Sequence, residues 1–211
     1  MSKQILIAMG TTLVIILLVL LLTSTSSKDS STDTLSQTDS DTSSHHGSAA
    51  ADEKIFNDLV GKKAPNLELE SYDGKKISLE QFKGKNVVLF FSEGLMCYPS
   101  CWNQIAAFGK DSAFNNKDTV VLTITVDRKI DWGQAVSKMP ELVSATVLFD
   151  ENKVVSNEYG VLTLSSSMHR GQFPGHTYFI VDKEGIIRFV KDDPEMGVRN
   201  DELKSELEKI K

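Results

Sequence analysis

Short apolar runs separated by polar turns recur along the chain after about residue 60, and they predict strands. The runs Val87–Phe91 and Thr119–Val126 have the length and the β-branched and aromatic content of buried strands. Two further pairs of short runs flank turns that contain Asp and Gly, which predicts two hairpins. The first hairpin joins Leu67–Leu69 to Ile77–Leu79, and the second joins Thr177–Val181 to Ile186–Val190.

Helical periodicity follows most of these strands. After the run Val87–Phe91, the residues Trp102, Ile105 and Phe108 are spaced as one buried helical face. Strands that alternate with helices and end in a hairpin and a helix predict an α/β domain, with a central mixed sheet flanked by helices. The remaining expected elements are helices at Asp131–Met139, Asn152–Tyr159 and Asn200–Lys211 and a strand at Ala145–Phe149.

The amino-terminal residues have a different pattern. Ile5–Leu22 is an apolar run of eighteen residues without a charge, and a helix of that length is roughly 27 Å long, close to the hydrocarbon core of a bilayer. No small-x-small cleavage site closely follows the run, and no cysteine follows it to accept lipid, so we predict that residues 1–22 form an uncleaved transmembrane anchor rather than a signal peptide. Lys3 favours a cytoplasmic amino terminus. We therefore expect a single-pass protein of the cell membrane, with its carboxy-terminal domain on the extracytoplasmic side.

Residues 23–53 read as a flexible linker. Fifteen of the twenty-two residues in Thr23–Ser44 are Ser or Thr, a composition that buries too little apolar surface to offset the entropy of ordering. The net charge of −6 divides into +1 before the linker, −5 within it and −2 over residues 54–211. The third segment is thus one nearly neutral domain, without the basic surplus that indicates nucleic-acid binding.

Chemistry concentrates at the only two cysteines of the chain, Cys97 and Cys101. They follow a predicted strand, at the point where a helix begins, and a helix amino terminus favours the thiolate. This placement makes Cys97 the candidate nucleophile. Two thiols four residues apart on a helix have Cα atoms roughly 6 Å apart, which a disulfide can span. The alternative interpretation is two cysteines that only fill a core.

Several stretches resemble the thioredoxin-fold redoxins. They are APNLELESYDGKKISLEQFKGKNVVLFF, the paired cysteines, VLFDENKVVSNEYGV and GHTYFIVDKEGIIRFV. Over residues 59–211 they are similar to the alkyl hydroperoxide reductase and thiol-specific antioxidant group, the TlpA-type exported thiol oxidoreductases and the Sco-type copper chaperones. The resemblance implies a thioredoxin-like fold with a redox-active pair at Cys97 and Cys101.

Departures from these patterns bear on the function. Peroxiredoxins have the signature Pro-x-x-x-Thr-x-x-Cys. When its cysteine is placed on Cys97, the proline position holds Phe90 and the threonine position holds Gly94, which argues against a peroxidase. The spacing Cys-x-x-x-Cys is similar to the Sco pattern rather than to Cys-x-x-Cys. Thioredoxin-like chains place a cis-proline before the strand that faces the cysteines; His176 stands there, with Pro174 two residues earlier, and Sco-type proteins have a copper-binding histidine at this point.

Two thiolates and an imidazole suit Cu(I), so Cys97, Cys101 and His176 form a candidate metal site. The alternative for His176 is a polar residue at a strand end, bonded to backbone. Residues in adjoining loops that could add donors are Met96, Met168 and His169.

Two auxiliary residues adjoin the cysteines. Glu93 precedes them and could move protons during thiol exchange if it is buried nearby, whereas an exposed loop carboxylate is the alternative. Trp102 is expected to pack beside the disulfide.

The leading hypothesis is a membrane-tethered, extracytoplasmic thiol–disulfide oxidoreductase of antioxidant type, in which Cys97 attacks and Cys101 resolves. It needs no cofactor, and its partners would be a redox protein and an exported protein substrate. The second hypothesis is a Cu(I) chaperone that uses Cys97, Cys101 and His176 to supply a membrane oxidase. The third is a thiol peroxidase.

Overall fold

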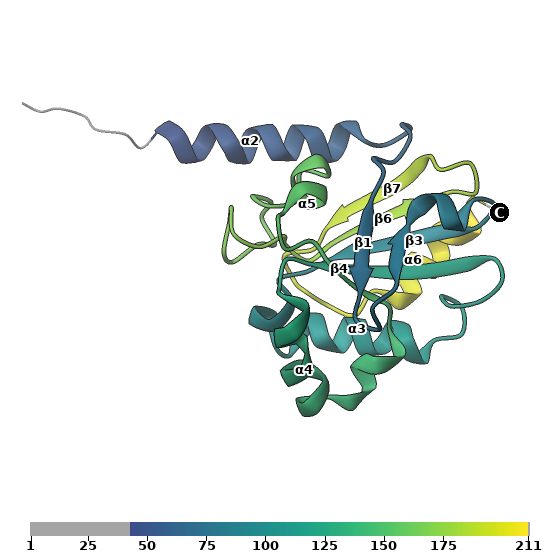
Figure 1. The fold of residues 1–211 in the computed structure, drawn as a ribbon. Coiled ribbons are helices and arrows are strands. Elements are labelled where there is room, and N and C mark those ends of the chain that lie inside the picture. Colours follow the sequence, from purple (N-terminus) through teal and green to yellow (C-terminus); the bar gives the residue numbers. More distant parts are fainter. Residues whose placement is uncertain (1–42, 211) are drawn as a thin grey trace, which may run out of the picture. The chain divides into compact units, whose positions relative to one another are not determined.

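The computed structural model describes residues 43–210, which form a seven-stranded sheet with helices packed on both faces (Figure 1). The strand order is β2-β1-β5-β4-β3-β6-β7. The strands are β1 (Glu68–Ser71), β2 (Lys76–Ser78), β3 (Asn86–Phe91), β4 (Thr119–Thr125), β5 (Val147–Phe149), β6 (Thr177–Val181) and β7 (Ile187–Asp192). The helices are α2 (Ser43–Asp58), α3 (Ser100–Lys110), α4 (Lys129–Lys138), α5 (Val154–Glu158) and α6 (Asn200–Glu208), with 3-10 turns η1 (Leu79–Phe82), η2 (Gly94–Cys97) and η3 (Pro140–Ser144).

Strand β3 lies inside the sheet and is buried along its whole length. It pairs in parallel with β4 and antiparallel with β6, and β4 pairs in parallel with β5. Parallel neighbours need a crossover connection, and α3 supplies the one between β3 and β4. Both predicted hairpins are present, β1 with β2 and β6 with β7. The mixed sheet predicted from the apolar pattern is therefore confirmed.

Alternation along β3 divides the core into two. Val88 and Phe90 point to the face covered by α3, α4 and α6, whereas Val87, Leu89 and Phe91 point to the face covered by α2 and α5. Successive side chains of a strand point to opposite faces, so a strand buried on both sides has no polar alternation. Each fully buried side chain of this size contributes about 1.5–3 kcal/mol.

Helix α2 corrects the predicted linker boundary. Residues 43–53, assigned to a flexible linker, belong to this helix. Ser, Thr and acidic residues dominate the linker as a whole and predict a flexible chain. Its last residues differ, because Ala50, Ala51 and the charged residues after them favour helix. Phe56 then anchors the helix, since it is buried and its ring lies 5.2 Å from that of Phe179.

Within residues 43–210, no helix has both the length and the apolar character needed to cross a membrane. The anchor predicted at residues 1–22, and the linker as far as residue 42, lie outside the described residues. Both remain predictions.

Candidate active site

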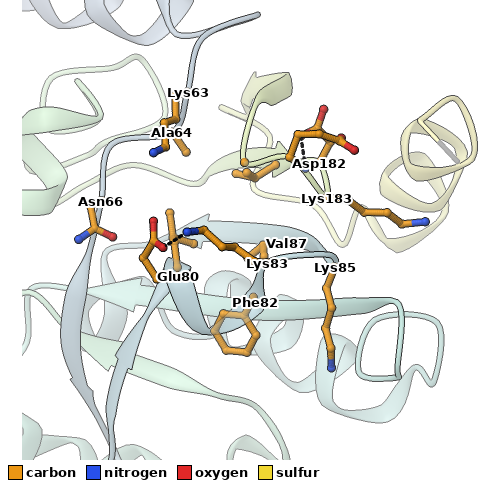
Figure 2. A pocket seen from close by; sticks show the side chains of 14 residues that line it. Lys63, Ala64, Asn66, Glu80, Phe82, Lys83, Lys85, Val87, Asp182 and Lys183 are labelled. Carbon is orange, nitrogen blue, oxygen red and sulfur yellow. Dashed lines mark hydrogen bonds and ion pairs between the residues drawn. The ribbon is translucent and has the colours of Figure 1, made fainter.

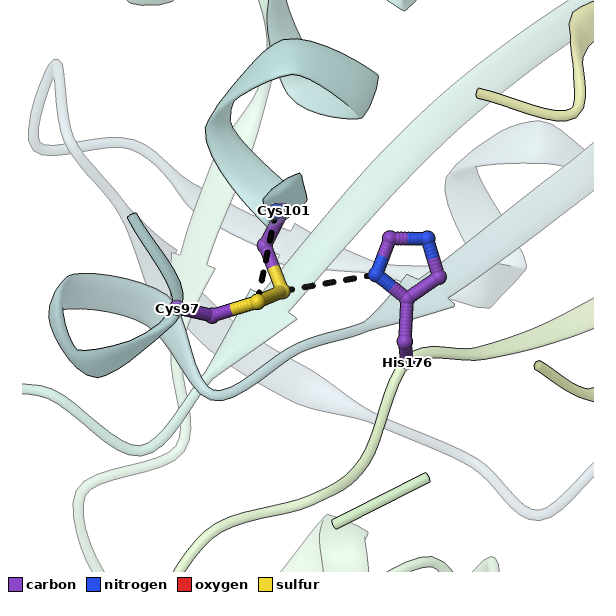
Figure 3. Close-up of side chains that lie close together, drawn as sticks. All are labelled: Cys97, Cys101 and His176. Atoms are coloured by element: carbon purple, nitrogen blue, oxygen red, sulfur yellow. Dashed lines mark hydrogen bonds between the residues drawn. A yellow bond between two sulfur atoms is a disulfide. The ribbon is translucent and has the colours of Figure 1, made fainter. Parts of the chain in front are cut away.

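The two cysteines form a disulfide at the end of the central strand β3 (Figure 3). The chain leaves β3 at Phe91, makes the short turn η2 that ends at Cys97, and enters α3 at Ser100. Cys101 lies in the first turn of α3, and the two Cα atoms are 5.4 Å apart. Helix α3 begins three residues later than predicted, so Cys97 precedes the helix rather than opening it.

Cys97 nevertheless receives the electrostatic effect of the helix amino terminus. The backbone N–H of Cys101 donates to Cys97 Sγ across 3.2 Å. An unpaired N–H of a first helical turn aimed at sulfur stabilises the thiolate over the thiol. The favoured nucleophile is therefore the first cysteine of the pair.

Exposure also distinguishes the two sulfurs. Cys97 retains 3% of its surface, whereas Cys101 has none. The residues on either side of Cys97, Met96 and Tyr98, are about half exposed. Cys97 is therefore the sulfur nearer the surface, and Cys101 lies deeper in the protein.

The loop that presents Cys97 is fixed through Gly94. Trp102 Nε1 donates to the Gly94 carbonyl across 2.9 Å, and the next residue, Leu95, donates its N–H to Asp127 Oδ2 across 2.8 Å. Thr125 also donates its hydroxyl to that carboxylate oxygen, across 2.7 Å. Gly94 has φ +57°, and a Cβ there would lie 1.8 Å from the same oxygen. Trp102 thus holds the loop, and it belongs to the same buried core as the two cysteines.

His176 lies against the second cysteine. Its Nδ1 is 3.4 Å from Cys101 Sγ (Figure 3). Its Nε2 is 2.7 Å from the Tyr178 hydroxyl and 3.2 Å from the Gly197 carbonyl. The side chain is fully buried. Burial lowers the pKa of His176 to about 4, so the imidazole is neutral near pH 7.

The three candidate metal ligands are brought together. The donor atoms of Cys97, Cys101 and His176 lie within 4.8 Å of one another. Binding would require prior reduction, because a disulfide has no thiolate to offer. A Cu(I) role for this cluster stays a prediction.

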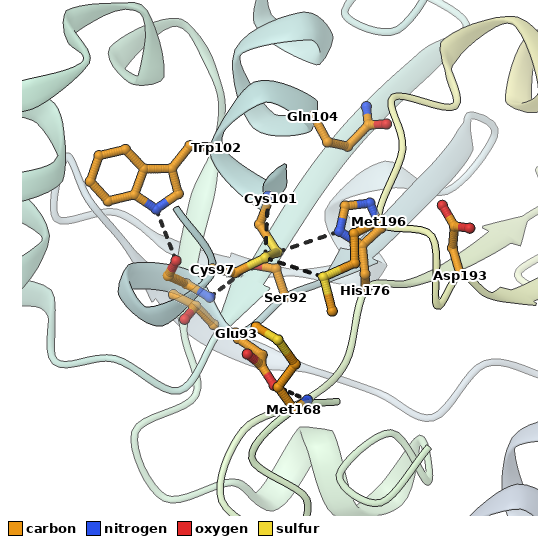
Figure 4. The surroundings of a disulfide bond; sticks show 12 residues. Ser92, Glu93, Cys97, Cys101, Trp102, Gln104, Met168, His176, Asp193 and Met196 are labelled. Atoms are coloured by element: carbon orange, nitrogen blue, oxygen red, sulfur yellow. Dashed lines mark hydrogen bonds between the residues drawn. A yellow bond between two sulfur atoms is a disulfide. The ribbon is translucent and has the colours of Figure 1, made fainter. Parts of the chain in front are cut away.

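For the additional donors named from the sequence, the structure gives no contact with either cysteine sulfur. His169 turns its Nδ1 to Glu93 at 3.2 Å, and Met168 exposes its side chain. The thioether that does contact the pair belongs to Met196, whose Sδ is 3.9 Å from Cys97 Sγ (Figure 4). Met196 lies far along the chain in the loop after β7, so no local sequence signal indicated it.

Glu93 is fully buried. One carboxylate oxygen accepts the backbone N–H groups of Met168 and His169, at 2.5 and 3.0 Å, and the Ser167 hydroxyl at 3.2 Å. The carboxylate therefore ties the loop before β6 to the cysteine loop (Figure 4). A part in proton transfer stays a prediction.

Pro174, which stands two residues before His176 in the chain, is buried. In the part of the chain that the structure describes, the cis peptide bond is the one between Tyr98 and Pro99. The peptide bond before Pro174 is therefore trans.

A separate pocket of about 230 Å³ opens at the opposite end of β3, near Val87 and Val181 (Figure 2). Lysine side chains such as Lys83 and Lys85 surround its apolar floor. None of the cysteines or histidines described above lines this pocket, so it is separate from the candidate site.

A disulfide-bonded cysteine pair after the central strand of a thioredoxin-like sheet defines the class of the protein, a redoxin. The AhpC/TSA family matches residues 60–190, and the chain belongs to this family.

Peroxiredoxins are among the relatives of this chain. The chloroplastic peroxiredoxin Q of Triticum aestivum is 34% identical over 132 residues, which cover 62% of this chain and 57% of the relative. The peroxiredoxin of Thermotoga petrophila is 31% identical over 151 residues, 69% of this chain and 68% of the relative. The chain thus spans under two thirds of the wheat relative's own length.

Solved structures agree on the fold. The mitochondrial 2-Cys peroxiredoxin of Plasmodium falciparum superposes with a TM-score of 0.60 at 28% identity, covering 72% of this chain and 94% of the other. The reduced 2-Cys peroxiredoxin of Plasmodium vivax gives a TM-score of 0.57 at 26% identity, covering 69% and 78%. The predicted thioredoxin-like fold and redoxin family are confirmed, whereas the Sco-type features stay predictions.

Proposed function

We propose that this redoxin is a thiol–disulfide oxidoreductase that cycles Cys97 and Cys101 between dithiol and disulfide. One observation carries the proposal: the two sulfurs are already bonded within an intact fold, with the first sulfur at the amino terminus of α3. No rearrangement is required to bring the resolving thiol to the attacking one. Such a pair can open and close without unfolding the domain.

The cycle balances over two electrons. The Cys97 thiolate attacks a substrate disulfide, forms a mixed disulfide and releases one substrate sulfur as a thiolate. The Cys101 sulfur then attacks Cys97 Sγ, the mixed disulfide breaks, and the second substrate sulfur leaves. The protein ends oxidised and the substrate ends reduced. A partner dithiol that runs these steps in reverse restores the reduced protein.

The amino-terminal pattern suggests the cellular setting of this reaction. The apolar run Ile5–Leu22 and Lys3 favour a membrane tether that holds the domain on the extracytoplasmic side. The partners would then be an exported protein substrate and a second redox protein. No cofactor is needed for the exchange.

A thiol peroxidase is the second candidate, and the names of the peroxiredoxin relatives favour it. In this reaction the Cys97 thiolate attacks a hydroperoxide, giving a sulfenic acid and an alcohol or water, and Cys101 condenses with it to give the disulfide and water. The sequence around the nucleophile argues against it. Phe90 and Gly94 replace the proline and threonine of the peroxiredoxin signature, so the second position offers no hydroxyl.

The two candidates are separated by measuring the oxidation of the reduced, full-length protein. Tryptophan fluorescence follows the reaction under matched excess of hydrogen peroxide or of a disulfide-bonded protein, with Cys97→Ser as the inactive control. We expect fast, saturable oxidation by the disulfide and slow, non-saturating oxidation by peroxide. The reverse order of rates would assign the peroxidase instead.

A further inference from the structure

A buried chain of polar groups leads away from the disulfide, and two of its members have no role so far. Tyr178 lies in β6 and His176 directly precedes this strand. Residues two apart on an extended chain share a face, so both side chains face α3. Residues three apart on a helix also share a face, and Cys101 and Gln104 are three apart on α3. The two rows meet: Cys101 lies against His176, and the Tyr178 hydroxyl lies 3.0 Å from Gln104 Oε1.

The Gln104 amide has one orientation only. The backbone N–H of Arg199 is 2.7 Å from one of its terminal atoms, and a backbone N–H can only donate, so that atom is the oxygen Oε1. The amide nitrogen then donates to Asn200 Oδ1 across 2.9 Å. Gln104 is fully buried, so no water competes for these positions.

This orientation determines where the Tyr178 proton lies. Gln104 Oε1 accepts the phenol O–H, so that the phenol oxygen presents a lone pair to His176 Nε2 at 2.7 Å. The Gly197 carbonyl, which also only accepts, lies 3.2 Å from the same nitrogen. Two acceptors facing Nε2 require that Nε2 carries the ring hydrogen. Nδ1, which lies 3.4 Å from Cys101 Sγ, is therefore unprotonated and has a free lone pair.

The ring cannot turn to exchange its two nitrogens. Phe90 lies opposite Tyr178 in the sheet, stacks on the phenol at 4.8 Å and meets the imidazole edge-on at 4.7 Å. The phenol also contacts Phe108 edge-on at 6.5 Å. These aromatic contacts hold both rings in place, in a region where every side chain named is buried.

We propose that Gln104, acting through Tyr178, is a positioning residue that holds His176 as the Nε2–H tautomer and so presents a bare Nδ1 to the resolving cysteine. The inference rests on the proposed dithiol–disulfide cycle. In the resolving step the Cys101 thiol proton passes to Nδ1 while Cys101 Sγ attacks Cys97 Sγ. The bond from Cys97 to the substrate sulfur breaks and that sulfur leaves with the bonding electrons. It takes up the proton that Cys101 gave to the ring, so the products are the Cys97–Cys101 disulfide and a substrate thiol.

The tautomer itself is the first readout. Full-length protein with ¹⁵N-labelled histidine, in detergent micelles, gives separate ring-nitrogen signals for the Nε2–H and Nδ1–H forms. We expect His176 in wild-type protein to be the Nε2–H form. In Gln104→Met the phenol O–H loses its closer acceptor and keeps the Gly197 carbonyl at 3.4 Å. His176 Nε2 at 2.7 Å then competes for that proton, so the Nδ1–H form appears. Wild-type protein in the Nδ1–H form, or an unchanged tautomer in Gln104→Met, would overturn the proposal.

Reaction with an aromatic disulfide whose thiolate absorbs light, 5,5′-dithiobis(2-nitrobenzoic acid), is the second readout. The first thiolate released reports attack by Cys97, and the second reports resolution by Cys101. We expect Gln104→Met to slow the second phase about tenfold, the effect of one ordinary hydrogen bond, and to leave the first phase unchanged. Equal slowing of both phases would indicate general structural damage and contradict the proposal.

Two further variants separate positioning from folding. Adding Tyr178→Phe to Gln104→Met removes the competing phenol proton. The double variant should therefore regain the Nε2–H form and a faster second phase. A second phase slowed by the sum of the two single effects would contradict the proposal. Tyr159→Phe is the matched control, because its equally buried hydroxyl donates to the Pro65 carbonyl in the other core. It should change neither readout. If wild-type protein shows no second phase at all, the dithiol cycle fails, while the tautomer result still stands.

Discussion

Replacing Gly94 by alanine tests how the loop that carries the nucleophile is held. Gly94 has φ +57°, in the left-handed region where an L side chain costs about 1–2 kcal/mol. The new Cβ would lie 1.8 Å from Asp127 Oδ2 and 2.2 Å from Thr125 Oγ1, so both side chains must move. Moving the Asp127 carboxylate breaks its hydrogen bonds from Leu95 and Thr125, each worth about 1.5 kcal/mol at the low end for a charged acceptor. The expected loss of stability is therefore about 4 kcal/mol.

Gly84→Ala is the matched control. Gly84 has φ +82°, also in the left-handed region, but a Cβ there meets nothing within 4 Å. Only the backbone cost of about 1–2 kcal/mol applies. The difference between the two variants isolates the close approach of Asp127 to the loop.

Urea denaturation provides the assay, because both tryptophans of the chain, Trp102 and Trp132, are buried and report unfolding by fluorescence. With a urea dependence of about 2 kcal/mol per molar, Gly94→Ala should lower the midpoint by about 2 M and Gly84→Ala by less than about 1 M. Equal losses in the two variants would refute the reasoning, since backbone strain alone would then explain both.

Three further outcomes follow from the site. The pKa of His176 is 6.5 in an unfolded chain and about 4 in the folded protein, so the unfolded chain binds the proton first as pH falls. About 3 kcal/mol of stability should therefore be lost between pH 6.5 and pH 4, as measured by urea titrations at each pH. His176→Gln should not show this loss. Burial raises the pKa of Asp127, so the folded state holds its proton longer and stability should fall as pH rises above 3.8; Asp127→Asn should remove this decline, and an unchanged decline would show that another group causes it. Cu(I) titration of reduced protein against a competing chelator tests the metal hypothesis, which requires that His176→Ala weakens binding strongly and is ruled out if binding does not depend on this residue.

Much of the fold follows from local pattern. The run Val87–Phe91 is apolar at every position, and a strand buried on both faces requires this. Helix α3 was indicated by the spacing of Trp102, Ile105 and Phe108, all of which are buried. Helix α2 was missed because its stability depends on Phe56 reaching the core, a tertiary contact that composition does not reveal.

The site was predictable in part. The paired cysteines stand out by count and spacing, and His176 was located through the family resemblance. Gln104 and Tyr178 were missed, because their contact depends on how α3 packs over β6. Gln104 did carry a signal: it is a polar residue on the same helix face as Cys101 and Phe108.

The central claim is that Cys97 attacks and Cys101 resolves, and trapping of the mixed disulfide tests it most directly. The full-length variants Cys97→Ser and Cys101→Ser are each reduced and mixed with a disulfide-bonded protein, and the adducts are measured by mass under non-reducing conditions. The account predicts a stable one-to-one adduct for Cys101→Ser, because its Cys97 still attacks and nothing resolves the product, and none for Cys97→Ser. An adduct formed by Cys97→Ser instead, or by neither variant, would contradict it.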